Sequence, residues 1–202
     1  MAELESPMMP KLISFLSSLL EKVAESNDET QTQQKQKMSV FHGETRPNIS
    51  IQSYLERIFK YANCSSSCII VAYVYLDRFT RLQPSLPINS FNVHRLLITS
   101  VMVAAKFMDD VCYNNAYYAK VGGIPKSEMN FLELDFLFGV GFNLNVTPVT
   151  FQAYCVHLQK QMLQMQPLNF VDSTLSLAKS FKTHLCFNED ESSHQNQQQL
   201  AV

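Results

Sequence analysis

The sequence predicts an all-α protein, and three observations support this prediction. Only 5 glycines occur among the 202 residues, and none lies between Glu44 and Val121, whereas an all-β chain needs glycine-bearing turns about every 8–12 residues. Prolines fall between apolar segments and almost never inside them, as expected for a residue that breaks helix interiors but is tolerated in a first turn. Within these segments, apolar residues recur at helical spacing.

The N-terminal part is expected to hold one helix and one linker. Residues 8–25 carry apolar side chains at helical spacing with Ser and Glu opposite them, which predicts an amphipathic helix. Residues 26–40 are rich in Gln, Lys, Asp and Thr, a composition typical of a disordered linker. The folded core is therefore expected to begin near Pro47.

The later helices follow from apolar stripes between polar breaks. A stripe from Ile51 to Phe59 predicts one helix, and the apolar run from Cys68 to Leu82 predicts a buried one. Leu96–Met108 is apolar almost all round, as in a central helix. Further helices are expected at residues 114–120, 127–138, 149–165 and, frayed, 170–186. The acidic, then Gln-rich stretch at 188–202 predicts a disordered tail.

Capping residues predict where these helices begin and end. The expected N-caps are Ser50, Asn89 or Ser90, Ser127, and Thr147, which precedes a proline at the first helical position. The Gly139-Val140-Gly141 segment predicts a helix end rather than a phosphate loop, because no strand precedes it and no third glycine follows.

Charge and cysteine content limit the possible partners and the location. The formal net charge is −2, from 16 basic and 18 acidic residues, which argues against nucleic acid as the main ligand. The 5 widely spaced cysteines predict reduced thiols rather than a metal site. The apolar stretch Leu12–Leu20 follows acidic Glu3 and Glu5, so it is not expected to be a signal peptide. An intracellular protein without a membrane partner, in the nucleus, the cytoplasm or both, is predicted.

Catalytic patterns are missing from the sequence. The histidines are scattered, the adjacent carboxylates Asp109 and Asp110 point different ways on a helix, and no nucleophile motif occurs. We therefore expect no enzyme activity, no catalytic residue, no cofactor and no bound metal.

Two charged residues stand out within apolar helices. Lys106 is the only charge between Arg95 and Asp109, and Glu133 lies between Leu132 and Leu134. A charge in such a setting needs water or a partner, because burying it unpaired costs several kcal/mol. Three interpretations remain open: side chains that extend to solvent, an internal Lys106–Glu133 ion pair, or a polar clamp at the rim of an apolar groove that binds another protein.

Several segments together resemble the cyclin box. Within the cyclins, they are similar to the plant P-type family, also called U-type, which is akin to the fungal phosphate-pathway cyclin and includes the cyclin-U4 proteins. The resemblance covers about residues 46–165. The segments are Ile51–Tyr61, Val74–Phe79 (VYLDRF), Val103–Phe107 (VAAKF), Leu132–Leu137 (LELDFL), Gly141–Leu144 (GFNL) and Val146–Phe151 (VTPVTF).

This resemblance implies both an architecture and a function. The fold would be a single five-helix cyclin box at residues 46–145, preceded at 1–45 by the N-terminal helix and linker. One or two flanking helices at 146–187 and the tail would follow. The box helices would cover residues 50–62, 66–82, 89–109, 114–121 and 126–139. The protein would be a regulatory subunit that binds and activates a cyclin-dependent protein kinase, with a role in cell-cycle or phosphate-linked signalling.

The resemblance also assigns kinase-binding residues. Lys106 and Glu133 would hydrogen-bond backbone near the regulatory helix of the kinase, while Phe107, Leu137 and Phe142 would line an apolar groove between the third and fifth box helices. The arginine that pairs with the aspartate of the second box helix in mitotic cyclins is missing here, so Asp77 has no predicted partner. The alternative functions are a cyclin-fold transcription adaptor and a kinase-independent helical scaffold.

Overall fold

The computed structural model describes residues 8–31 and 39–164, which belong to the first of two compact units, residues 1–170. The described residues form helices and loops without a strand, so the fold is all-α as predicted. The helices are α1 (Met8–Gln31), α2 (Ile51–Tyr61), α3 (Ser66–Leu82), α4 (Val93–Met108), α5 (Asn115–Gly122), α6 (Lys126–Gly139) and α7 (Pro148–Gln164).

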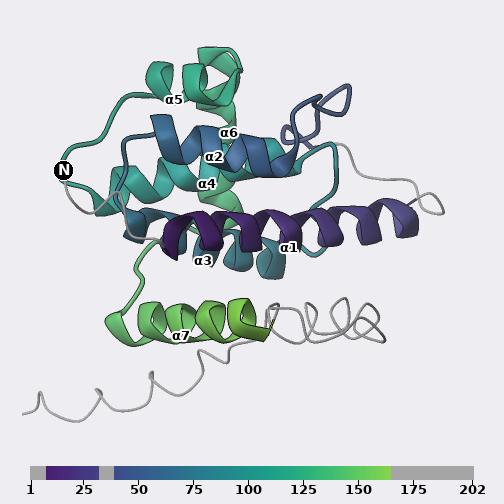
Figure 1. Ribbon diagram of the computed structural model, residues 1–202. Helices are drawn as coiled ribbons and strands as arrows, with labels where there is room; N and C mark the ends of the chain where they lie inside the picture. Colours follow the sequence, from purple (N-terminus) through teal and green to yellow (C-terminus); the bar gives the residue numbers. More distant parts are fainter. Residues whose placement is uncertain (1–7, 32–38, 165–202) are drawn as a thin grey trace, which may run out of the picture. The chain divides into compact units, whose positions relative to one another are not determined.

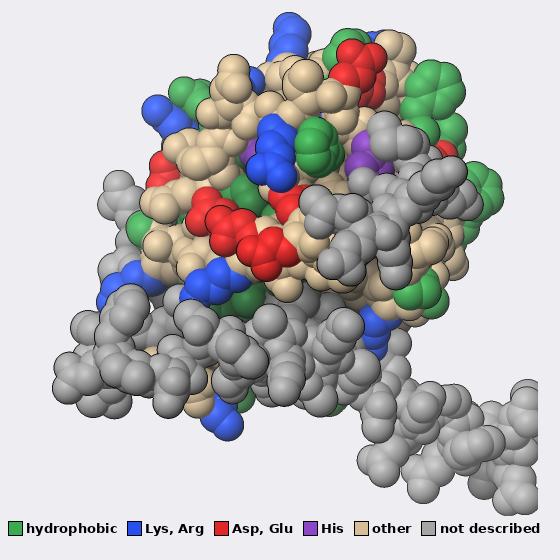
Figure 2. All heavy atoms as spheres, turned by 90° about the vertical axis from the view of Figure 1, so that its right-hand side faces the viewer, with side chains coloured by type: hydrophobic (Ala, Val, Ile, Leu, Met, Phe, Trp, Pro, Cys, Tyr) green, Lys and Arg blue, Asp and Glu red, His purple; other side chains and the backbone are tan. Residues whose placement is uncertain are grey.

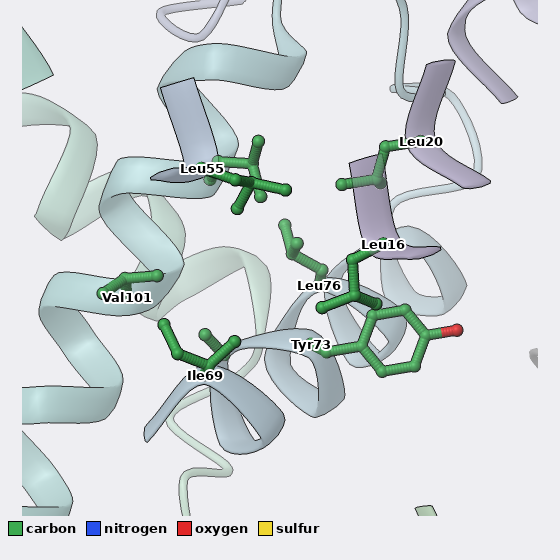
Figure 3. Close-up of a pocket in the computed structure, with 9 residues that line it drawn as sticks. Leu16, Leu20, Leu55, Ile69, Tyr73, Leu76 and Val101 are labelled. Carbon is green, nitrogen blue, oxygen red and sulfur yellow. The ribbon is translucent and has the colours of Figure 1, made fainter. Parts of the chain in front are cut away.

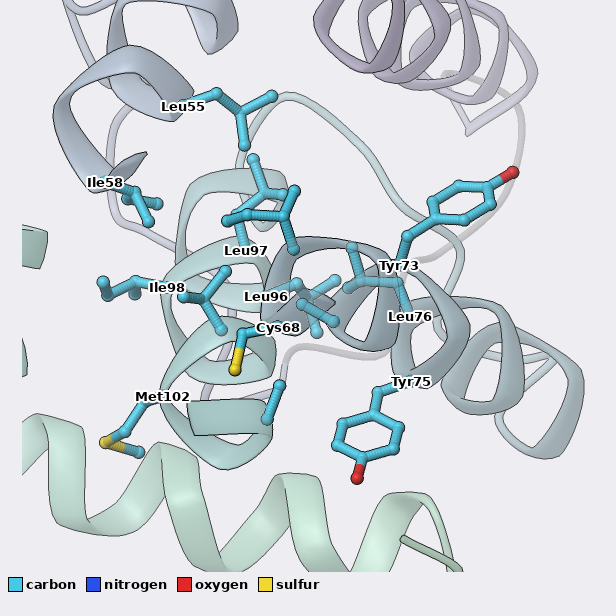
Figure 4. Packing of buried hydrophobic residues seen from close by; sticks show 14 of the residues in the cluster. Leu55, Ile58, Cys68, Tyr73, Tyr75, Leu76, Leu96, Leu97, Ile98 and Met102 are labelled. Atoms are coloured by element: carbon cyan, nitrogen blue, oxygen red, sulfur yellow. The ribbon is translucent and has the colours of Figure 1, made fainter. Parts of the chain in front are cut away.

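Helices α3 and α4 form the centre of the described part. Their apolar character on nearly all sides is explained by their neighbours, because α4 packs against α2, α3, α5 and α6, and α3 also packs against α7. Helix α1 packs against α2 and α7, and Figure 1 shows α5 and α7 on opposite sides of the other helices. The close-up in Figure 4 shows Leu96, Leu97 and Ile98 of α4 facing side chains of α3 and α2.

Helix α1 is longer than predicted: it continues into the first part of the expected linker and ends at Gln31. Two polar residues in this last part bind the loop between α3 and α4. The Asn27 amide donates to the Ile88 carbonyl at 2.7 Å, and the Asp28 carboxylate accepts the Ser90 hydroxyl at 2.5 Å. The polar side chains of Asn27 and Asp28 thus make long-range contacts, and this part of the expected linker is helical.

A small apolar cavity lies beneath α1. Figure 3 shows Leu16 and Leu20 of α1 facing Leu55 of α2, with Ile69 and Leu76 of α3 across from them. All five side chains are buried. The first helix therefore covers part of the core formed by the helices that follow it.

Two of the predicted N-caps are confirmed. The Ser50 hydroxyl accepts the Ser53 amide at 3.1 Å, and Thr147 accepts the amide of Thr150 at 3.1 Å. The cap of α6 was predicted wrongly, because this helix begins after Pro125 and contains Ser127 in its first turn.

The start of α4 also differs from the prediction. Asn92 occupies the N-cap position without a side-chain cap bond, and the helix begins at Val93. The predicted cap Asn89 instead closes a turn before the helix, where its side-chain oxygen accepts the amides of Phe91 and Asn92 at 2.9 and 3.1 Å. Asparagine commonly stabilises such turns in this way.

The remaining predictions concern parts of the chain that the structure does not describe. The expected helix at 170–186, the tail at 188–202, and residues 32–38 of the linker lie outside the described residues. In the part that is described, no helix has the length and apolar character needed to cross a membrane.

Candidate protein-binding site

A polar cluster joins the end of α4 and the start of α5 to the middle of α6. Lys106, in the last turn of α4, donates from Nζ to Oε1 of Glu133 on α6 at 2.6 Å. Asn115, the first residue of α5, accepts a second hydrogen bond from Lys106 through Oδ1. Its amide nitrogen donates to Glu133 Oε2 at 2.7 Å and to Asn130 Oδ1 at 2.8 Å. The Lys106–Glu133 ion pair, one of the three interpretations left open by the sequence, is therefore present. Asn115 is hydrogen-bonded to both charged groups.

The ion pair lies at the surface of the described part. The side chain of Lys106 is 29% exposed and that of Glu133 is 20% exposed. An ammonium group has three donors and Lys106 uses two of them here, while an ionised carboxylate accepts up to about four hydrogen bonds. Both groups can therefore bind a further polar group from outside, so an internal pair and a clamp for a partner are compatible.

Apolar side chains at the surface lie beside this cluster in the chain. Phe107 follows Lys106 directly and is 50% exposed, and Phe142 follows α6 and is 56% exposed. Leu137, one turn after Glu133 on α6, is partly buried against the core. Large aromatic rings in such positions lose unfavourable contact with water when a partner covers them.

The position of Phe142 depends on how α6 ends. The amide of Phe142 donates to the Leu137 carbonyl at 2.9 Å, and the Gly141 amide donates to the Phe138 carbonyl at 3.0 Å. This bond pattern is a Schellman motif, in which Gly141 adopts the left-handed conformation with φ +61°. The predicted helix end at Gly139–Gly141 is thus confirmed, and it turns the chain so that Phe142 contacts the ring of Phe138 at a centroid distance of 5.1 Å.

Helix α6 also exposes a row of apolar side chains to solvent. Phe131, Leu134 and Phe138 recur at intervals of three and four residues and are 64%, 53% and 69% exposed. Residues at this spacing share one face of a helix. Together with Phe142, they form an apolar surface that we call the α6 row.

The segment after Phe142 is held against α3. Arg78 donates from Nη1 to the carbonyls of Asn143 and Asn145, both at 2.9 Å, and the Tyr75 hydroxyl donates to the Leu144 carbonyl at 2.7 Å. These bonds connect buried side chains of α3 to the backbone that follows the site. The orientation of Phe142 is therefore supported from the core.

The structure brings together some of the predicted site residues and adds others. It pairs Lys106 with Glu133, whereas the ring contact of Phe142 is with Phe138, which was not singled out in the sequence. Asn115 was also missed, because nothing in its local sequence indicates contacts with residues 9 and 18 positions away. The exposed row on α6 has a recognisable signal, namely large apolar residues on a face opposite the buried Leu132 and Phe136.

Asp77, which had no predicted partner, has two in the structure. Arg81, one turn further along α3, donates to its Oδ2 at 2.5 Å, and the Tyr154 hydroxyl of α7 donates to the same oxygen. Burial raises the pKa of Asp77, while these two donors act in the opposite direction. A tyrosine from the flanking helix therefore binds this carboxylate in place of the missing arginine.

Charge is mixed on the face of the molecule shown in Figure 2. Acidic side chains gather near its centre with lysine or arginine side chains beside them, and hydrophobic side chains protrude along its right-hand edge. The described side chains visible on this face do not form the continuous basic stripe that nucleic-acid binding requires.

Comparisons with known proteins agree with these features. A family model described as "Cyclin" matches residues 7–144, a range that includes α1 to α6. Cyclin-U4-1 of Arabidopsis thaliana is 70% identical over the full length of both chains, and Cyclin-U4-3 of the same plant is 56% identical over 99% of this chain and 94% of its own. Cyclin-P4-1 of Oryza sativa subsp. japonica is 56% identical over 81% of this chain and 80% of its own.

Proposed function

Because this chain belongs to the cyclin family, whose members are regulatory subunits, we propose that it binds and activates a cyclin-dependent protein kinase. The observation that carries this proposal is the Lys106–Glu133 pair. Both charges are held in place by Asn115 and retain unused hydrogen-bonding capacity at the surface. A partner backbone with a free carbonyl and a free amide matches that capacity.

The apolar residues supply the area that the polar pair lacks. Phe107 and Phe142 are half-exposed, and Leu137 is partly buried against the core. In protein interfaces, a few well-packed aromatic residues account for most of the binding energy, and polar contacts at their edge set the register. We assign Lys106, Glu133, Phe107, Leu137 and Phe142 to the kinase-binding surface on this basis.

The mechanism of activation would be positional. A cyclin that binds the regulatory helix of a kinase holds it inward, so that the kinase's own Lys–Glu ion pair can form. The binding partner shifts a kinase equilibrium by its differential affinity for the active state and contributes no catalytic residue, cofactor or metal. We further propose an intracellular complex, in the nucleus, the cytoplasm or both, that acts in cell-cycle or phosphate-linked signalling.

Kinase capture with matched variants tests the proposal. The full chain is immobilised and incubated with purified cyclin-dependent kinases. The dissociation constant of the complex and the activity of the bound kinase are then measured. Lys106→Ala and Glu133→Ala are each expected to weaken binding by about 2–5 kcal/mol, the usual effect of truncating one member of a buried polar contact.

The chain offers a closely matched control. Arg95 of α4 and Glu128 of α6 form a second ion pair between the same two helices, and their side chains are 23% and 29% exposed. Arg95→Ala and Glu128→Ala should leave kinase binding unchanged. If folded Lys106→Ala binds the kinase as tightly as the wild type, the assignment of the site is contradicted. If the wild-type chain binds no kinase, the scaffold or the adaptor function is favoured. Salt-dependent DNA binding would then identify the adaptor.

A further inference from the structure

The outer face of α6 is apolar and exposed to solvent. The fully buried Leu132 and Phe136 mark the side of this helix that faces the core. Successive residues of an α-helix are rotated by about 100°. Phe131, Leu134 and Phe138 of the α6 row therefore lie on the opposite side from the core. Three large apolar side chains are thus placed where only solvent or a partner can cover them.

The exposed area of the α6 row is large for a soluble protein. Phe131, Phe138 and Phe142 are 64%, 69% and 56% exposed, and the rings of Phe138 and Phe142 are in contact. With about 200 Å² for each phenylalanine, the three residues present roughly 400 Å² to solvent. A contiguous apolar patch of several hundred Å² usually marks an interaction site. The row therefore has the size of a site for one short segment of a partner.

This face of α6 differs from the one assigned to the kinase. Glu133 lies on the side of α6 that faces α4 and α5, because it binds Lys106 and Asn115 there. Leu137 is one turn further along the same side. The three α6 residues of the α6 row lie on average about a third of a turn around the helix from this side. A kinase helix beside Glu133 and Leu137 therefore leaves most of the α6 row uncovered, and only Phe142 belongs to both surfaces.

One charged residue lies beside the apolar side chains of this face. Asp135 is four residues after Phe131 and three before Phe138, so the three side chains are neighbours on the helix surface. Asp135 is exposed, and no described residue forms an ion pair or a hydrogen bond with its carboxylate. In contrast, the other two carboxylates of α6 are in ion pairs with residues of α4. The face is therefore complementary to an apolar partner that carries a positive charge.

We propose that the three α6 residues of the α6 row, together with Asp135, form a docking site for an arginine-bearing amphipathic helix of a protein other than the kinase. Amphipathic helices bind apolar surfaces through side chains three, four and seven positions apart, and the apolar residues of α6 have the same spacing. The guanidinium of the arginine would form a bidentate pair with Asp135 and stack on a neighbouring phenylalanine ring. This site is separate from the proposed kinase-binding surface and would bind its partner without a kinase.

Charge argues against two other occupants of this face. Helices that lie on anionic membranes carry Lys and Arg on their polar side, whereas α6 has three acidic residues and one basic residue, Lys126. A second copy of this chain, packed row to row about a two-fold axis near Leu134, would bring two Asp135 carboxylates together. Like charges that meet in an interface oppose association. A cationic helix of another protein avoids both conflicts.

A peptide selection tests the docking site directly. The full chain and its Asp135→Lys variant are immobilised, and a phage-displayed library of helical peptides is selected on each. The library keeps apolar residues three, four and seven positions apart and randomises the remaining positions. The wild type should enrich arginine at one position about tenfold over the unselected library, because the charge pair and the ring contact both favour it. Asp135→Lys should enrich aspartate or glutamate at that position instead.

Binding of one selected peptide then identifies the residues that contact it. Its dissociation constant is measured with the full chain by fluorescence anisotropy. Phe131→Ala and Asp135→Ala should each weaken binding about tenfold. Leu163→Ala is the matched control and should leave binding unchanged, because Leu163 is a similarly exposed apolar residue, at 73%, on α7. If Asp135→Lys does not fold, Asp135→Ala still decides, since it should remove the preference for arginine in the selection.

Other occupants of this face give results that would overturn the proposal. One is a wild-type selection without a preference for a cationic residue, or with a preference that Asp135→Ala leaves unchanged. Another is a dimer in sedimentation that Leu134→Ser abolishes, which would identify a second copy as the occupant. Binding to phosphatidylserine vesicles that Phe131→Ala abolishes would identify a membrane. Loss of kinase capture by folded Asp135→Lys would assign the face to the kinase.

Discussion

The hydroxyl of Tyr154 on α7 donates a hydrogen bond to the carboxylate of Asp77 on α3. Both residues are almost completely buried, with 4% and 2% of their surfaces exposed. Burial raises the pKa of Asp77, so its ionised form depends on its donors, Tyr154 and Arg81. This contact attaches the flanking helix to the centre of the fold.

Removing the Tyr154 hydroxyl should therefore destabilise the protein. Tyr154→Phe leaves the carboxylate with one donor fewer, and the expected loss is about 1–3 kcal/mol of unfolding free energy. Urea unfolding measures it. Tyr54→Phe is the control, because the Tyr54 hydroxyl donates to the uncharged Gly122 carbonyl at 3.1 Å and its loss should be about 0.5–1.5 kcal/mol. A smaller effect at Tyr154 than at Tyr54 would contradict the importance of the buried charge.

The Lys106–Glu133 pair should contribute little to stability. Because both side chains are partly exposed, each alanine substitution is expected to change the unfolding free energy by less than about 1 kcal/mol. A double-mutant cycle by chemical unfolding should give a coupling of about 0.2–1 kcal/mol. Coupling of several kcal/mol would show instead that the pair is a structural element of the core.

The cavity beneath α1 predicts a strong effect of shortening its lining. Leu16→Ala removes buried side-chain atoms beside space that is already unfilled, so the expected loss is about 2–5 kcal/mol. Leu163→Ala on α7 is the control, since this side chain is 73% exposed and its change should stay within about 0.5 kcal/mol. Thermal and urea unfolding of both variants check this. A loss at Leu16 no larger than that at Leu163 would mean that α1 is not packed on the core in solution.

Two glycines near the candidate site should respond differently to alanine. A Cβ at Gly139 would lie 2.3 Å from the ring of Phe79, which stacks on Phe136 at a centroid distance of 5.1 Å, so Gly139→Ala should cost about 1–3 kcal/mol through overpacking. A Cβ added at Gly141 would meet no neighbouring atom within 4 Å. Only the φ of +61° at this position opposes alanine, at a cost of about 1 kcal/mol. Calorimetric melts of the two variants distinguish the causes, and a larger loss at Gly141 would contradict the packing argument.

Acid should destabilise the fold through His94. Burial lowers the pKa of His94, whose Nε2 bonds the Ile49 carbonyl at 2.9 Å. The folded pKa lies below the unfolded value of 6.5, so the unfolded state binds more protons and stability falls as the pH drops below about 6.5. His94→Gln keeps a donor and does not titrate, so its urea midpoint should fall less between pH 7 and pH 5. Parallel pH profiles of wild type and variant would exclude a contribution from His94.

The helices and two caps could be predicted because their signals are local. The serine at position 50 and the threonine at 147 act on amides three residues away, within the range of a sequence pattern. The end of α1 could not be predicted in this way. Asn27 and Asp28 bind residues 61 and 62 positions away, and polar composition alone does not distinguish such contacts from a linker.

The candidate site was predictable only in part for the same reason. Lys106 and Glu133 stand out as isolated charges in apolar helices, and the structure pairs them. Asn115 and Tyr154 carry no such signal, because asparagine at a helix start and tyrosine within a helix are common in any sequence. Their roles follow from the packing of α5 against α6 and of α7 against α3.

The bond between Asp28 and Ser90 also constrains the order of events during synthesis. The two residues are 62 positions apart, which corresponds to roughly 3–12 s at typical translation rates. During that interval the growing chain contains α1 but not the loop to which the end of this helix is attached. Helix α2 emerges earlier and can cover part of the apolar face of α1. While the chain is still on the ribosome, α1 is therefore expected to pack in two stages. It first contacts α2, and the hydrogen bond between Asp28 and Ser90 forms later.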